Sequence, residues 1–255
     1  HPRAVLGSGE PPKLLTTPEV RREELLGYGA DEVRVIRFDL ELSRKSPREF
    51  VRDVLVGEMG ADAVVVGENF RFGYKAAGDV RDLSALMQEA GGAAHAVPVR
   101  AAGEMDEISS TRVRALISEG EVEEAAALLG RPYVLRGEVV EGDRRGRTIG
   151  FPTANVLPDP AALVPARGVY AGSVRVGERE YAACTNVGVA PTFARHESRV
   201  EAHLLDFQGD LYGRIVDVAF AHRIREEKRF TGVDELKEQI RRDVEEARRI
   251  SQDPA

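Results

Sequence analysis

Residues 168–187 read GVYAGSVRVGEREYAACTNV, and two stretches within them, 169–176 and 181–187, are short runs with the alternating pattern of β-strands. A period of two places the apolar side chains on one face of a strand. Runs of the same kind recur at residues 136–140, 200–205 and 215–220. Short strands in this succession predict a small antiparallel barrel.

A long helix is expected after the last of these strands. Thr231 and Asp234 are spaced as in a capping box. Apolar residues then recur at helical spacing, at Val233, Leu236, Ile240, Val244 and Ala247. The pattern predicts an amphipathic helix that packs on the barrel.

The first half of the chain alternates helical and strand signals, which is typical of a layered α/β domain with a mostly parallel sheet. Ser46 and Glu49 have the spacing of a capping box, with a proline after the serine, so residues 50–57 are expected to be helical. Thr17 and Pro18 begin another helix in the same way. Two further helical runs, around 113–117 and at 122–129, lead to the barrel and are expected to bridge the two domains.

Two short strands are predicted in this half, at residues 33–38 and 63–66. The second runs directly into the loop 67–73, which reads GENFRFG. Ligands of open α/β sheets bind beyond the carboxyl ends of the strands. This loop is therefore a candidate binding site.

Composition limits the class of protein. A chain of 255 residues with 42% hydrophobic content is long enough for two domains. The single cysteine, Cys184, cannot form an internal disulfide, and no apolar run approaches the roughly 18 residues that a membrane helix needs. A reducing, cytoplasmic setting is expected. The formal net charge of −7 argues against nucleic acid or an anionic membrane as partner, which leaves small-molecule substrates.

The stretch 146–155, GRTIGFPTAN, carries the strongest chemical signal. Gly146 and Gly150 allow backbone N–H groups to approach phosphate oxygens, and Arg147 can neutralise their charge. The hydroxyl of Thr153 and the amide oxygen of Asn155 can help to hold Mg²⁺. The spacing does not match a P-loop. The pattern alone leaves open a purely structural glycine-rich turn.

This stretch resembles the G-R-x-x-G-F-P-T-A-N signature of riboflavin kinases, in particular those of the bacterial bifunctional riboflavin kinase/FAD synthetases. Further blocks resemble the same family in the same order. They are GVYAG at 168–172, TNVG at 185–188, PTF at 191–193, VEAHLLDF at 200–207, DLYG at 210–213 and REEKRF at 225–230. One departure is Ala190, where the family pattern has an arginine.

The resemblance implies a fold and an activity. The fold is a Rossmann-like nucleotidyltransferase α/β domain over residues 1–128, followed by a six-stranded antiparallel β-barrel kinase domain with a C-terminal helix over residues 129–255. The activity is transfer of the γ-phosphate of ATP to riboflavin to give FMN. The sequence leaves open whether the protein forms a homo-oligomer.

The resemblance also assigns roles to residues. Glu201 would be the general base, and Thr153 and Asn155 would hold Mg²⁺ and ATP, beside Gly146, Arg147 and Gly150. Residues expected to contact the flavin are Leu211, Tyr212 and Arg225. His203, which shares a strand face with Glu201, is expected to be structural.

The α/β half resembles an FMN adenylyltransferase domain, so the parent protein is expected to make FAD as well. The matching residues are Asn69, Phe70 and Arg71 in the loop, and Ser109, Ser110, Thr111 and Arg112 at the start of a helix, where free N–H groups can bind phosphate. The family's opening G-x-F-D-G-x-H-x-G-H motif is absent from this sequence, which begins at His1. The sequence is therefore expected to be N-terminally incomplete, to make no FAD as written, and to have a less stable α/β half.

Two other functions are compatible with such folds. One is a sensor that binds a flavin or nucleotide without catalysis, and the retention of Glu201, Thr153 and Asn155 argues against it. The other is an oligonucleotide-binding barrel. An isoelectric point near 5.4 disfavours that function.

Overall fold

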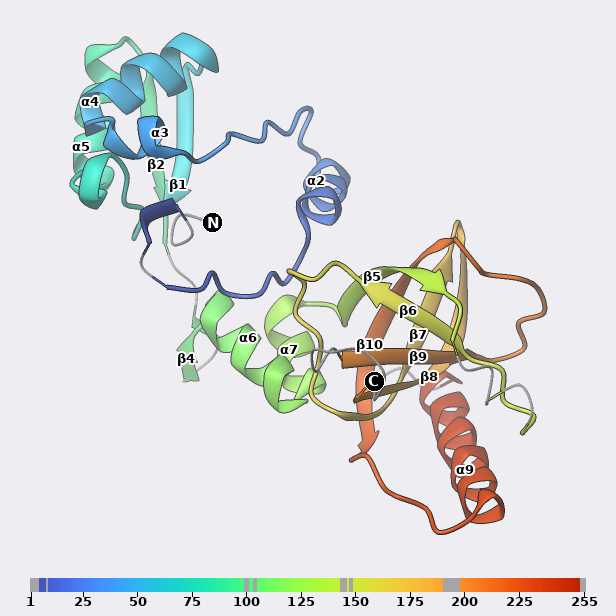
Figure 1. The fold of residues 1–255 in the computed structure, drawn as a ribbon. Helices are drawn as coiled ribbons and strands as arrows, with labels where there is room; N and C mark the ends of the chain where they lie inside the picture. Colours follow the sequence, from blue (N-terminus) through green and yellow to red (C-terminus); the bar gives the residue numbers. More distant parts are fainter. Residues whose placement is uncertain are drawn as a thin grey trace. The chain divides into compact units, whose positions relative to one another are not determined.

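The computed structural model describes residues 5–7, 9–98, 101–102, 105–142, 146, 149–189 and 198–252 (Figure 1). The chain forms two compact units. The first unit contains His1–Pro12 and Val33–Ile108, and the second contains Lys13–Glu32 and Ser109–Ala255. No helix in the described part of the chain combines the length and the apolarity that a membrane crossing requires.

A closed six-stranded antiparallel barrel dominates the second unit, in the order β10-β5-β6-β9-β8-β7. Its strands are β5 Tyr133–Val140, β6 Ala154–Pro158, β7 Gly168–Val176, β8 Arg179–Val189, β9 Ser198–Leu204 and β10 Ile215–Arg225. The predicted barrel is confirmed, and five of its strands match the alternating runs of the sequence. The sixth, β6, was not predicted as a strand because it is short and lies at the end of the glycine-rich stretch.

Aromatic rings and aliphatic side chains fill the interior of the barrel. Tyr170 meets Phe220 edge to face at 5.3 Å, and Tyr133 stacks on the same ring at 6.3 Å. The two tyrosine hydroxyls donate hydrogen bonds to backbone carbonyls, that of Tyr133 to Leu163 at 2.5 Å and that of Tyr170 to Ala166 at 2.6 Å. The rings pack in the apolar interior, and each hydroxyl has a hydrogen-bond partner.

The helices α6 Ser110–Glu119 and α7 Val122–Leu129 belong to the same compact unit as the barrel, where α7 packs on the strand β10 and α6 packs on α7. Gly120 joins the two helices with a left-handed backbone, at φ 88°. Arg223 of β10 fixes the pair, because its N–H donates to the Glu123 carboxylate at 2.9 Å and its guanidinium reaches the Glu119 carbonyl at the end of α6. A cation at the negative end of a helix is electrostatically favourable.

The helix α2 Pro18–Gly27 also belongs to the barrel unit. Thr17 caps it as predicted, since the hydroxyl accepts the N–H of Val20. A charged network docks α2 on the outer wall of the barrel. Arg136 lies 2.7 Å from Glu23 of the helix and 2.6 Å from Asp217, and Arg175 lies 2.6 Å from the same aspartate.

The long C-terminal helix, α9 Val233–Gln252, packs across β7, β8 and β10 as predicted. Its start differs in one detail. The N–H and the hydroxyl of Thr231 donate to the carboxylate of Glu235, at 3.1 and 2.9 Å. The prediction that Asp234 is the capping partner of Thr231 was therefore wrong. The reason is that the helix begins at Val233, which places Glu235 within reach of Thr231.

The first unit is a small α/β layer. Its parallel strands β1 Ala63–Gly67 and β2 Ala93–Val97 pair directly. The other elements are α3 Leu40–Arg44, α4 Pro47–Glu49, the π-helix η1 Phe50–Glu58, the 3₁₀ turn η2 Tyr74–Ala76, α5 Val80–Glu89, and the short antiparallel pair β3 Ala101–Ala102 and β4 Met105–Glu107. Buried Val51, Phe72, Leu83 and Met87 form its core.

Two sequence predictions for this unit have different outcomes. The capping box of Ser46 and Glu49 is present and begins the short helix α4. The residues after it are helical as predicted, but they form the π-helix η1 and not an α-helix. The strand predicted at 33–38 is wrong. This segment has no hydrogen-bonded neighbour among the strands that the structure describes, and Val35 is 74% exposed. β-branched residues need a partner strand and a buried face to form a strand.

Asp217 is the centre of the network that joins α2 to the barrel, and we predict that Asp217→Asn lowers the free energy of unfolding by roughly 2 to 4 kcal/mol. Asp217 is only 9% exposed, so its loss leaves two guanidinium groups short of their counter-charge. Urea denaturation at pH 7 measures the effect. Glu238→Gln is the control, because it removes only exposed pairs on α9.

The same network predicts a pH dependence. Desolvation raises the pKa of Asp217, but hydrogen bonds from Arg136 and Arg175 outweigh it and hold the pKa below its usual value. A depressed folded pKa stabilises the protein at neutral pH, and this stabilisation is lost as the pH falls below the ordinary Asp range. The difference between wild type and Asp217→Asn should therefore shrink in acid. An equal or larger difference at pH 3 would contradict the assignment.

Candidate active site

The register of the barrel aligns polar side chains from neighbouring strands in one row. Asn155 of β6 is directly opposite Glu201 of β9, and Glu201 is opposite Asn186 of β8. The row continues through Val169 of β7 to Arg225 of β10. Directly paired residues of antiparallel strands share one face. The row therefore spans β6, β9, β8, β7 and β10 on a single face.

That face is the outside of the barrel. Along β9 the alternate residues Val200, Ala202 and Leu204 are buried in the interior, whereas Glu201 and His203 are half-buried. Side chains alternate between the two faces of a strand. Glu201 therefore points away from the core, toward the side that α9 covers.

The cavity between this face and α9, called the helix-side cavity, has a volume of about 350 Å³. The lining residues that matter for its chemistry are Phe151, Thr153, Asn186, Arg199, Glu201, His203, Arg225 and Phe230, with Leu236, Ile240 and Val244 from α9. Gly146 also lines it. The polar and charged groups come mainly from the barrel, and α9 contributes apolar side chains together with the buried carboxylate of Asp243.

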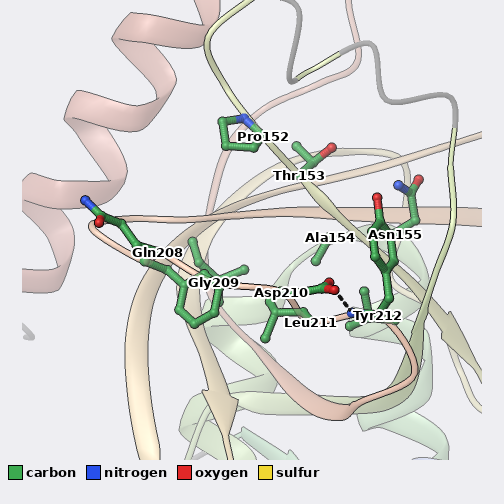
Figure 2. A pocket seen from close by; sticks show the side chains of 12 residues that line it. Pro152, Thr153, Ala154, Asn155, Gln208, Gly209, Asp210, Leu211 and Tyr212 are labelled. Atoms are coloured by element: carbon green, nitrogen blue, oxygen red, sulfur yellow. Dashed lines mark hydrogen bonds between the residues drawn. The ribbon is translucent and has the colours of Figure 1, made fainter.

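A second cavity, the turn-side cavity, has a volume of about 510 Å³ and is shown in Figure 2. Thr153 and Asn155 line it from β6 and the residue before it, and Leu211 and Tyr212 line it from the turn before β10. The Tyr212 N–H donates to the Asp210 carboxylate at 3.0 Å, which closes this turn. Thr153 lines both cavities, so the two meet at this residue.

Arg199 links two residues of the row. Its Nε donates to the Asn155 Oδ1 at 2.9 Å, and its guanidinium NH2 group lies 2.9 Å from the Glu201 Oε1. Arg199 stands two positions before Glu201 on β9, so both side chains leave the same face of the strand. Arg199 was not among the residues predicted from the sequence, where its spacing of two from Glu201 was the only signal for it.

His203 holds the segment that leads into β6. Its Nδ1 lies 2.7 Å from the Pro152 carbonyl, which can only accept, so Nδ1 carries the proton. The ring also meets Phe151 edge to face at 5.7 Å. These contacts steady the residues just before Thr153, in line with the structural role expected for His203.

Arg225 is bound to a buried carboxylate. Its guanidinium donates to Asp243 of α9, from Nε at 3.0 Å and from NH2 at 2.6 Å, and Asp243 is only 3% exposed. A second pair, between Arg248 and Asp206, ties the helix to the turn after β9 at 2.7 and 2.9 Å. These pairs fix α9 as one wall of the helix-side cavity.

The side-chain oxygens of Thr153 and Asn155 are ligands of the kind that Mg²⁺ takes. The backbone of Gly142 lies so close that a Cβ atom there would come within 2.2 Å of the Asn155 amide. A Cβ at Gly146 would come within 2.3 Å of the Phe151 carbonyl, and 3.3 Å of the Thr153 hydroxyl. The two glycines thus make room for a hydroxyl and an amide oxygen, which are ligands that suit Mg²⁺ when phosphate oxygens complete its shell. Among the described residues, no group of three His, Cys, Asp or Glu could hold a metal.

The structure divides the predicted site residues between the two cavities. Glu201, Gly146 and Arg225 line the helix-side cavity, Asn155, Leu211 and Tyr212 the turn-side cavity, and Thr153 both. The three residues expected to contact the flavin are therefore not together. Gly150, at φ 92°, lies in the turn before Phe151 and lines neither cavity, while Arg147, Ala190 and the block 191–193 lie outside the described residues.

The residues predicted for the adenylyltransferase lie in both units. Asn69, Phe70 and Arg71 follow β1 in the first unit, where the Arg71 guanidinium donates to the Ala76 carbonyl at 2.8 Å. Ser109, Ser110, Thr111 and Arg112 begin α6 in the second unit. The Ser109 hydroxyl accepts the N–H of Arg112 at 3.3 Å and so acts as an N-cap.

Comparisons with known proteins agree with this fold. A family model of riboflavin kinase matches residues 129–251, and one of FAD synthetase matches residues 1–112. The barrel is thus of the riboflavin kinase class.

Relatives match almost the whole chain. The Bacillus subtilis bifunctional riboflavin kinase/FMN adenylyltransferase is 36% identical, over 97% of this chain and 78% of that protein. The Escherichia coli K12 protein of the same name is 38% identical, over 97% and 79%. A crystal structure from Streptococcus pneumoniae, described as a macrolide-efflux protein, is 34% identical with a TM-score of 0.87, and covers 97% of this chain and 80% of that one.

The chain belongs to the family of bifunctional riboflavin kinase/FMN adenylyltransferases. It is an enzyme of flavin cofactor biosynthesis, with ATP and riboflavin or FMN as small-molecule substrates. The comparisons give no support to a non-catalytic sensor.

Cys184 of β8 is buried in the barrel wall beside the helix-side cavity, and its reactivity measures how well that wall is closed. Burial, together with the nearby Asp243 carboxylate, raises the pKa of this thiol to about 12, although Arg225 opposes the shift. At pH 8 only about one thiol in 10⁴ would be ionised, and the thiolate is the reactive form. We predict almost no reaction with a disulfide reagent such as DTNB in the native protein, and release of one equivalent of thiol in urea. Fast reaction of the native protein would show that this part of the barrel wall is open.

Proposed function

We propose that the row on the outer face of the barrel is the place where the γ-phosphate of ATP is transferred to the 5′-hydroxyl of riboflavin. The observation that carries the proposal is the direct cross-strand pairing of Asn155 with Glu201. It brings a carboxylate beside an amide, and Thr153, which lines both cavities, lies two positions before that amide in the chain. Phosphoryl transfer needs mainly positioning, a metal ion and one base.

Each cavity suits a different substrate. Glu201 lines the helix-side cavity and not the turn-side one, so the hydroxyl that loses its proton arrives from the helix side. The apolar wall of α9 and the rings of Phe151 and Phe230 suit the flat isoalloxazine. ATP would then bind in the turn-side cavity. Its adenine would lie near Tyr212, and its triphosphate would point toward Thr153 and Asn155.

Mg²⁺, when bound, would neutralise phosphate charge as the transition state forms. Thr153 and Asn155 would hold it through their side-chain oxygens. Glu201 accepts the proton of the riboflavin 5′-hydroxyl while that oxygen forms its bond to the γ-phosphorus. The bond from the γ-phosphorus to the bridging oxygen breaks, and ADP leaves. Arg225 contributes through Asp243, by holding α9 against the flavin.

The remaining assignments follow from the family and are part of the proposal. The start of α6, at Ser109, Ser110, Thr111 and Arg112, would bind phosphate groups in the adenylyltransferase reaction, because an α-helix N-terminus favours anions. The loop residues Asn69, Phe70 and Arg71 would contact the flavin of FMN. A cytoplasmic location agrees with the use of ATP and with the single, buried cysteine.

The base is tested by Glu201→Gln, which keeps the shape of the side chain and removes its basicity. We expect the turnover number for FMN formation to fall by roughly 10²- to 10⁴-fold. Chromatography of flavins after incubation with riboflavin, ATP and Mg²⁺ measures it. Glu138→Gln is the matched control, since Glu138 is an exposed carboxylate of β5 that lines neither cavity. Near wild-type turnover of the Glu201 variant would reject the assignment.

The division of substrates is tested by two aromatic truncations. Tyr212→Ala should raise the KM for ATP, and Phe230→Ala the KM for riboflavin, each by roughly 2- to 10-fold, the worth of one aromatic contact. In each variant the KM for the other substrate should stay within about twofold, since no contact to it is removed. The opposite pattern would mean that the two cavities are assigned the wrong way round.

A further inference from the structure

Arg199 bonds both to the proposed base and to the proposed metal ligand. One nitrogen donates to the Asn155 Oδ1 and another lies against the Glu201 Oε1, each at 2.9 Å. The side chain is 24% exposed and lines the helix-side cavity. A guanidinium is planar, and its donors have fixed relative directions. Two acceptors bound to one guanidinium are therefore held at a fixed separation.

The contact also defines the orientation of the Asn155 amide. The Arg199 Nε–H is a donor only, so the atom that it meets must be the amide oxygen and not the amide nitrogen. That oxygen has two lone pairs. One accepts from Arg199, and the other stays available for a cation. Arg199 thus fixes the orientation of the Asn155 amide, whose oxygen would be the atom that holds Mg²⁺.

We infer that Arg199 is a positioning residue for phosphoryl transfer, which holds the base Glu201 and the amide oxygen of Asn155 in register. The inference rests on the proposed function. A misplacement of reacting groups by about 1 Å can cost on the order of 10²-fold in rate. Because the pair is partly exposed, it contributes little to folding stability. The side chain can therefore be changed without loss of the barrel.

The test compares Arg199→Met, which removes both bonds, with Arg199→Lys, whose ammonium keeps the charge but not the planar fork. For Arg199→Met we expect kcat to fall by roughly 10- to 100-fold. The Mg²⁺ concentration for half-maximal rate should rise. The Kd for riboflavin, measured by quenching of flavin fluorescence without ATP, should stay within about twofold, because Arg199 acts through other residues. Arg199→Lys should recover only part of kcat.

Arg179→Met is the control, since Arg179 is an exposed arginine at the start of β8 and lines neither cavity. It should keep wild-type kcat. An unchanged kcat and Mg²⁺ dependence in Arg199→Met, with FMN still formed by the wild type, overturns the role of Arg199 alone. A loss of riboflavin affinity with unchanged kcat also overturns it, in favour of a substrate contact. Absence of FMN formation by the wild type overturns the proposed function itself.

Discussion

The pairing of β6 with β9 is the constraint on which the whole site depends. Asn155 and Glu201 are distant in sequence, and only the register of these two strands places them opposite each other. A slip of one residue would turn the side chains of one strand to the other face. Glu201 would then point into a core that is filled by Tyr133, Tyr170 and Phe220. Closure of the barrel prevents such a slip, because every strand is paired on both edges.

The outer face becomes a cavity only because α9 is fixed over it. The Arg225–Asp243 pair is the main anchor, since Asp243 is almost fully buried and Gln239 also donates to it, at 2.9 Å. Removing one partner of such a pair is costly, because it leaves a buried charge without compensation. Arg225 also lines the helix-side cavity, so its contact with the flavin stays a prediction. Its pair with Asp243 holds one wall of that cavity in place.

The fold could be predicted from the sequence wherever the apolar residues of a single segment recur with the period of a strand or a helix. The alternating runs gave the barrel strands, and the spacing of Leu236, Ile240 and Val244 gave α9. Segments whose strand character depends on a partner strand were predicted less accurately. Residues 33–38 have strand-forming composition but no partner strand among those described. The short strand β6 has too few residues to show a period, and its strand character comes from β5 and β9 on either side.

The residues of the candidate site could likewise be predicted where one segment identifies them, and not where their position depends on neighbouring strands. Thr153, Asn155 and Glu201 were identified through family motifs, and the structure brings them to one place. Leu211 and Tyr212 were grouped with Arg225, although the structure places them in different cavities, because adjacency across a barrel depends on strand order and register. Arg199 was missed because an arginine on a strand is usually a solvated side chain. The role of Arg199 can be inferred only from the structure, which shows its contacts to both Asn155 and Glu201.

The most direct test of this account is a crystal structure of the protein with riboflavin, Mg²⁺ and a non-hydrolysable ATP analogue. We expect the isoalloxazine between α9 and the barrel, the triphosphate at Thr153 and Asn155, and the ribityl 5′-hydroxyl within hydrogen-bond distance of Glu201. A nucleotide bound in the helix-side cavity, or a 5′-hydroxyl far from Glu201, would contradict it.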